Sequence, residues 1–251
     1  MSGHSKWHSI KHKKGAIDAK RGKIFTMHAK MVAIAAREGG GDPTTNSSLR
    51  AAIDNARADN VPNSNIERAI KTGTGDLKDQ AAFSEAMYEG FGPEGIAVYI
   101  QTISDNKNRT VASVKNILSK NGGNMAGAGA VSWMFHKKGV ILLTVDTSKK
   151  DDLELAAIDA GAEDVKSEGE NVEIITNIKD LQTVKAKLEQ AGYRVDKADL
   201  SFIPEKEVKI ETEDAARKVL KFIEALDEDD DVSNIYSNFD IPEEILNKIT
   251  D

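Results

Sequence analysis

Over residues 139–203 the spacing of apolar residues switches repeatedly between that of a strand and that of a helix. This pattern constrains the fold more than any other feature of the chain. Short runs with a period of two alternate with runs of helical period. The two helical runs end at Gly161 and Gly192, which supply helix C-caps. The expected elements are a strand at 140–145, a helix at 151–160, strands at 164–167 and 172–176, a helix at 178–191 and a strand at 195–203. This order is that of the split βαβ, or ferredoxin-like, unit.

The segments on either side of this unit have mixed helix and strand character. They predict strands at 87–91, 96–103 and 130–136, a helix through 111–118, and, after Pro204, a strand at 208–210, a helix at 215–226 and a strand at 232–237. The last elements can return to complete the sheet that begins near residue 83. We therefore expect a discontinuous α+β domain of residues 82–136 plus 205–251, into which a ferredoxin-like βαββαβ domain of residues 139–204 is inserted.

The first 76 residues predict a separate helical domain. A helical period begins at Ile17 and ends at the Gly39–Pro43 breaker, and two shorter helices follow, one after Asn46 and one that ends near Gly73. Residues 1–16 are too polar to bury much surface, so we expect a mobile arm that orders on binding a partner. The fold class is thus α+β, with an N-terminal helical bundle and two α/β sandwich-type domains, one ferredoxin-like and inserted in the other.

Charge is distributed unevenly along the chain. The net charge is −7, yet residues 1–80 carry 14 Lys and Arg against 8 Asp and Glu. The remaining residues carry 20 basic and 33 acidic side chains. A basic end on an acidic body is typical of a protein that binds a polyanion, because the partner responds to the local field.

The basic segment supplies the primary candidates for nucleic-acid binding. Its lysines and arginine can neutralise phosphates, and Trp7 can stack on an unpaired base. The alternative is a solvated basic tail. The candidates are His4, Lys6, Trp7, His8, Lys11, Lys13, Lys14, Lys20, Arg21 and Lys23.

The four-residue spacing of the histidines at positions 4, 8 and 12 suggests a metal site. On a helix His4 and His12 would lie about 12 Å apart along the axis, so three ligands cannot close on one ion. We expect no metal, and hydrogen bonds to phosphates or base edges instead.

Two further groups are candidates for secondary nucleic-acid contacts. Asn63, Asn65, Arg68 and Lys71 would be exposed on the third helix if the second and third formed a helix-turn-helix, although a plain bundle is favoured. Capping explains Asn106, but Arg109 needs a phosphate or a carboxylate partner.

Two other segments have ordinary explanations. The Gly-rich stretch 122–129 lacks the pattern of a phosphate-binding loop and indicates a hinge or a close-packing segment. The acidic run Asp227–Asp231 indicates a solvated helix end rather than a cation site.

Catalytic patterns are missing from the sequence. It has no cysteine, no Gly-x-Ser-x-Gly elbow and no His-Glu-x-x-His motif. We therefore expect no enzymatic activity, no cofactor and no small-molecule substrate. No apolar run is long enough to span a membrane, and the N-terminus has no signal-peptide core, so a cytoplasmic location is expected.

Several stretches together resemble the YebC family over essentially the whole chain. They are residues 3–7 with 10–11, 22–25, 60–62 leading to Ile66, 88–90 with 92–95, and 105–110. The resemblance implies a helical N-terminal domain, two α+β domains and no catalytic activity.

The resemblance also implies two alternative functions. Bacterial members are described as promoter-binding regulators, which predicts a DNA-binding transcriptional regulator. A mitochondrial member activates translation of a cytochrome oxidase subunit, which predicts a ribosome-associated factor whose arm contacts ribosomal RNA. An arm with Lys, His and Trp suits irregular RNA, whereas promoter specificity requires side chains held against base edges.

Overall fold

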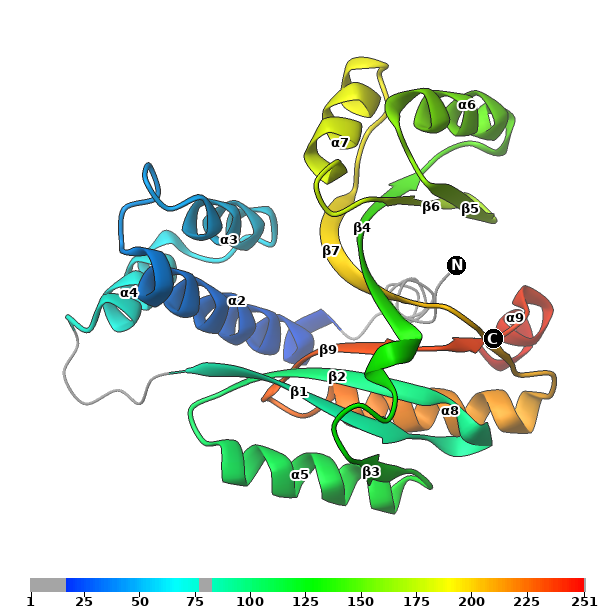
Figure 1. Cartoon of the computed structure of the whole chain (residues 1–251), viewed down its shortest axis with the longest axis horizontal. Coiled ribbons are helices and arrows are strands. Elements are labelled where there is room, and N and C mark those ends of the chain that lie inside the picture. The colour runs from blue at the N-terminus through cyan, green and yellow to red at the C-terminus, as the bar shows by residue number, and fades with distance from the viewer. Residues whose placement is uncertain (1–16, 77–82, 251) are drawn as a thin grey trace.

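The structure is a computed structural model that describes residues 17–76 and 83–250 (Figure 1). Its N-terminal helices are α2 (Ile17–Gly39), α3 (Ser47–Ala58) and α4 (Asn63–Thr74). Both α3 and α4 pack chiefly against α2 rather than against each other. Their apolar faces meet in one cluster that includes the buried side chains of Val32, Leu49 and Ile66.

Two residues fix the geometry of this bundle. The Asn46 side chain caps α3 by accepting the Leu49 N–H at 3.0 Å, and its amide donates to Ala35 O at the end of α2. Gly73 lets α4 approach α2 closely, because a Cβ at this position would lie 2.2 Å from Ala33 O. The bundle therefore depends on a polar cap and on a position without a side chain.

The first sheet has the strand order β3-β1-β2-β9. Its strands are β1 (Ser84–Phe91), β2 (Ala97–Ser104), β3 (Asn124–Ala126) and β9 (Val232–Ser237). Helices α5 (Lys107–Lys120) and α8 (Glu213–Asp227) cover one face of this sheet, as Figure 1 shows. The core lies between them and contains the buried side chains of Ile100, Leu118 and Phe222.

The second sheet is antiparallel and has the order β5-β6-β4-β7. In chain order its elements are β4 (Phe135–Thr144), α6 (Lys150–Ala160), β5 (Asp164–Glu168), β6 (Asn171–Thr176), α7 (Leu181–Gln190) and β7 (Lys197–Pro204). Its core lies between the sheet and the two helices, where Leu143, Leu153 and Leu188 are buried.

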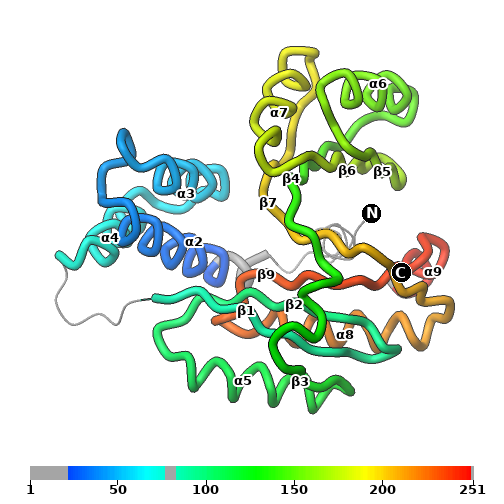
Figure 2. Tube along the Cα trace, in the orientation of Figure 1, coloured from blue at the N-terminus to red at the C-terminus, as the bar shows by residue number. Residues whose placement is uncertain are grey.

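Short elements complete the described chain. They are the 3-10 helices η1 (Pro93–Gly95), η2 (Ser132–Met134) and η3 (Thr147–Lys149), the parallel pair β8 (Val208–Lys209) and β10 (Phe239–Asp240), and helix α9 (Glu243–Thr250). Figure 2 shows that the chain leaves the first sheet after β3, builds the second sheet and returns to the first at β9.

The α+β class expected from the sequence is confirmed, and residues 135–204 follow the expected strand–helix–strand–strand–helix–strand order. The boundaries of three separate domains stay a prediction. The sequence analysis missed β3, β10 and α9, which are short or lie near the end of the chain.

The strand expected at 130–136 is wrong for most of its length. Residues 132–134 form η2, and β4 begins only at Phe135. The physical reason is that the Glu89 carboxylate accepts the N–H groups of Val131 and Ser132, which are then not available to a strand ladder. Over the described residues, no helix has the length and apolar character needed to cross a membrane.

Candidate nucleic-acid interface

Most of the candidate arm falls outside the described residues. His4, Lys6, Trp7, His8, Lys11, Lys13 and Lys14 precede Ile17, where the description begins. The backbone of Lys20 and Arg21 lies in the first turns of α2, but their side chains are also outside the described part. Their role in binding stays a prediction.

Lys23 is the candidate in this segment whose side chain is described. Its ammonium group donates to the backbone oxygen of Asp227 and, at 2.7 Å, to that of Asp229. The acidic segment Asp227–Asp231, which begins at the last residue of α8, therefore receives a lysine from α2. This contact uses donors that we had expected to face a phosphate.

Lys30, two helical turns further along α2, makes a second contact with the same segment. Its ammonium donates to Ile103 O at 3.0 Å, to Asp230 O at 2.8 Å and to Asp231 Oδ1 at 3.1 Å. The two charged side chains are only 8% and 10% exposed. The sequence analysis missed Lys30 because nothing near it in the chain indicates a partner 201 residues away.

Asp231 gathers several donors besides Lys30. Ser104 Oγ and Thr110 Oγ1 donate to Oδ2 at 3.0 and 2.9 Å, and Arg109 Nη2 lies 3.1 Å away. Burial alone would raise the pKa of Asp231, but these donors and Lys30 outweigh it and lower the pKa below its usual value. The expected solvated helix end is therefore wrong for Asp231, which is a buried anion.

The two secondary candidates in the 105–110 loop make intramolecular contacts. The Asn106 side chain caps α5 by accepting the Arg109 N–H at 3.1 Å. The Arg109 guanidinium also donates to Asp105 at 2.9 Å. Of the two partners expected for Arg109, the structure shows the carboxylates.

The four secondary candidates on α4 are all exposed, but they do not share one face. Asn63 and Asn65 are about 200° apart on an ideal helix, so they lie on opposite flanks. Asn65 and Arg68 line a hollow of about 320 Å³ between α4 and α2. The α2 side contributes Phe25 and Lys30, so this hollow combines amide, aromatic and cationic groups.

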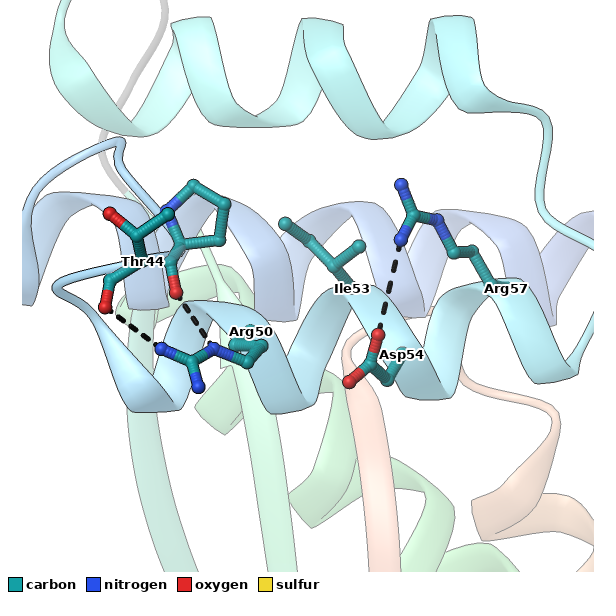
Figure 3. A pocket seen from close by; sticks show the side chains of 6 residues that line it. Thr44, Arg50, Ile53, Asp54 and Arg57 are labelled. Atoms are coloured by element: carbon teal, nitrogen blue, oxygen red, sulfur yellow. Dashed lines mark hydrogen bonds and ion pairs between the residues drawn. The ribbon is translucent and has the colours of Figure 1, made fainter.

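A second hollow, of about 410 Å³, is lined by Pro43 and Thr44 and by side chains of α3 (Figure 3). Arg50 donates to the backbone oxygens of Pro43 and Thr44 at 2.9 and 2.8 Å, and Arg57 lies 4.0 Å from Asp54. The arginines project from the helix two turns apart, about 10 Å along its axis. Their seven-residue spacing was the signal that could have added Arg50 and Arg57 to the candidates.

The segment that leads from the end of the Gly-rich stretch to β4 is held in place by one carboxylate. Glu89 accepts the N–H groups of Gly129 at 2.8 Å, Val131 at 2.6 Å and Ser132 at 2.9 Å. Burial alone would raise the pKa of Glu89, but these three donors lower it. Of the two alternatives, the structure supports close packing: a Cβ on Gly123 would lie 2.5 Å from a backbone oxygen of β1.

The ordered loop presents Trp133, which the sequence analysis did not single out. Its side chain is 63% exposed, and its indole N–H donates to Ala130 O at 3.1 Å. The chain has two tryptophans, so the rarity of this residue type beside a Gly-rich stretch was the available signal. Within the described ranges, no three His, Cys, Asp or Glu side chains gather as a metal site would require.

Comparisons with known proteins cover nearly the whole chain. Residues 5–76 match the model of the TACO1/YebC protein N-terminal domain, and residues 83–239 match that of the TACO1/YebC second and third domain. A protein from Thermotoga maritima is 50% identical over 99% of both chains, and one from Halothermothrix orenii is 48% identical over 100% of both. Both relatives are named "Probable transcriptional regulatory protein".

A solved structure of a relative has the same fold. The crystal structure of a conserved hypothetical protein from Aquifex aeolicus superposes with a TM-score of 0.82 at 42% sequence identity. The match covers 91% of this chain and 94% of that one.

Proposed function

This chain belongs to the TACO1/YebC family, and we propose that it is a non-enzymatic regulator of gene expression that binds nucleic acid through its N-terminal helical domain. The observation that carries this proposal is the placement of charge. Basic side chains are in excess over the first 80 residues and acidic ones over the rest. A polyanion would therefore approach this end of the molecule.

The described side chains divide the basic residues of this domain into two sets. Lys23 and Lys30 bind the acidic segment Asp227–Asp231 and hold α2 against the first sheet. Arg68 and Lys71 are exposed on α4, and no ion pair to either is seen among the described residues. We assign the second set, together with the basic side chains of residues 4–21, to the polyanion.

We further propose that the polyanion is duplex DNA and that regulation occurs at transcription. Regulation at transcription is supported by the names of relatives whose sequences are about half identical to this chain. On duplex DNA the lysines would contact phosphates, which give affinity without sequence information. Selectivity would then require side chains such as Asn65 and Arg68 to reach base edges.

The test compares the intact chain with a variant in which Lys6, Lys11, Lys13 and Lys14 are changed to Gln. None of the four positions belongs to the described core of the bundle. Binding to promoter fragments of the source genome, to unrelated duplex DNA and to purified ribosomes is measured at two salt concentrations.

A transcriptional regulator should discriminate its own promoter from unrelated duplex DNA by a factor of about 1,000 or more. That preference should survive the higher salt, and the Gln variant should bind both duplexes more weakly. Equal, salt-sensitive affinity for every duplex, together with ribosome binding that depends on the four lysines, would overturn the transcriptional proposal.

A further inference from the structure

We propose that Trp133 is a stacking site for an unpaired base of a single-stranded nucleic acid. The inference rests on the proposed function in that the ligand is a nucleic acid. It goes beyond the proposed function because Trp133 belongs to η2, which comes between β3 and β4 in the chain and is outside the N-terminal helical domain.

The ring of Trp133 is held in a defined orientation before any partner binds. The Glu89 carboxylate fixes the backbone at Gly129, Val131 and Ser132. The hydrogen bond from the indole N–H to Ala130 O then sets the orientation of the ring. A partner therefore does not have to order the loop, and the cost in conformational entropy on binding is reduced.

The indole ring of Trp133 presents only part of its surface to a partner. Because the indole N–H already has an acceptor, what remains for a partner is the apolar edge and the π face. Stacking on a base uses this face and tolerates any sequence. The residues at 126–132 are Ala, Gly, Val and Ser, so the loop itself adds no large apolar side chain to Trp133. An anchor for a protein partner would normally sit among other packed contacts.

The segment of the chain around Trp133 is basic. Residues 106–145 contain no Asp or Glu but six Lys or Arg, whereas all 33 acidic residues beyond residue 80 lie outside this segment. Lys137 is exposed four residues after Trp133, with its ammonium 6.0 Å from the Phe202 ring. His136 is also exposed and lies 3.7 Å from Glu205. Lys137 is therefore the cationic group of this segment that we assign to the phosphate next to a stacked base.

The test uses the fact that the chain has only two tryptophans. The variant Trp7→Phe leaves Trp133 as the single emitter. Its fluorescence is titrated with oligo-dT of about 12 nucleotides and with a duplex of the same length. We expect saturable quenching by the single strand and much weaker quenching by the duplex, whose bases are already stacked.

The second measurement follows the anisotropy of labelled oligo-dT in the otherwise unchanged chain. Trp133→Ala should weaken binding by about five- to 100-fold, and Trp133→Phe should weaken it less because a ring remains. The matched control is Leu155→Ala, which removes a side chain that is 64% exposed on α6 and should leave the affinity unchanged.

The outcomes separate this inference from the proposed function. Unchanged emission at saturating oligo-dT, or a Trp133→Ala variant that binds as tightly as the intact chain, would overturn the stacking site. Promoter selectivity could still be observed in that case. Conversely, quenching of Trp133 that persists when the lysines at 6, 11, 13 and 14 are neutralised would support the site even if duplex binding were lost.

Discussion

Nζ of Lys30 in α2 lies 3.1 Å from Oδ1 of Asp231, just before β9, and both side chains are almost fully buried. This ion pair joins the N-terminal bundle to the first sheet. Lys23 contacts the same acidic segment two turns earlier in α2. The orientation of the bundle is therefore set by specific charged contacts rather than by the linker alone.

Removal of one partner of this ion pair should destabilise the folded protein. We expect Lys30→Met to lower the free energy of unfolding by about 3 kcal/mol, because Asp231, Ile103 O and Asp230 O lose a buried donor. Urea denaturation measures the change. The control Lys71→Met removes an exposed lysine of α4 and should shift stability by less than about 0.5 kcal/mol. Equal effects of the two variants would contradict this account of Lys30.

Asp231 should make stability depend on pH at the acid end. Its pKa is lowered in the folded protein, so the carboxylate contributes stability that is present above the unfolded pKa of about 3.9. That contribution is lost as the pH falls through the folded pKa. In Asp231→Asn this part of the pH dependence should be absent. Melting temperatures between pH 7 and pH 3 provide the measurement, and parallel curves for the two proteins would exclude the effect.

Glu89→Gln should loosen the loop that carries Trp133. A glutamine replaces one acceptor oxygen by an N–H₂ group, so at least one of three charge-assisted hydrogen bonds is lost, at a cost of about 2–3 kcal/mol. In the Trp7→Phe background, near-UV circular dichroism should show a weaker Trp133 signal. Glu67→Gln, on the exposed side of α4, serves as the control. An unchanged spectrum would show that Glu89 does not order the loop.

Two glycines in helices should respond to alanine in opposite ways. Gly73→Ala brings a Cβ against Ala33 O and should destabilise the bundle by about 1–3 kcal/mol. Gly22→Ala meets no atom of the described residues within 4 Å and should stabilise α2 by up to about 1 kcal/mol through helix propensity. Thermal melts of both variants test the pair, and stabilisation by Gly73→Ala would show that α4 can move away from α2 without cost.

The regular elements could be predicted because their signals are local. Apolar periods and glycine caps placed the helices of the bundle and the order of elements in the second sheet within a few residues. The start of β4 could not be predicted this way. It depends on Glu89, a side chain more than 40 residues earlier, which removes Val131 and Ser132 from strand pairing.

The candidate site was less accessible to sequence reasoning for the same physical reason. Charge counts indicate a polyanion partner, but they cannot show which lysines are already used within the fold. Lys30 and Asp231 are brought together only by the packing of α2 on the first sheet. Arg109 is an example: the residues around it in the sequence are compatible with a phosphate partner and with a carboxylate partner, so the sequence does not distinguish the two.

For Lys23, experiments can separate a role in nucleic-acid binding from a role in the stability of the fold. Its ammonium already contacts the backbone oxygens of Asp227 and Asp229. Lys23→Ala should therefore lower stability by about 1–2 kcal/mol while the salt dependence of DNA binding stays nearly unchanged. Lys71→Ala should do the reverse: it should leave stability within about 0.5 kcal/mol and reduce the slope of log K against log salt by about 1. Paired measurements of unfolding and of duplex binding distinguish the two roles. If Lys23→Ala changed the salt slope by the same amount as Lys71→Ala without loss of stability, its contacts with the acidic segment would have to give way when DNA binds.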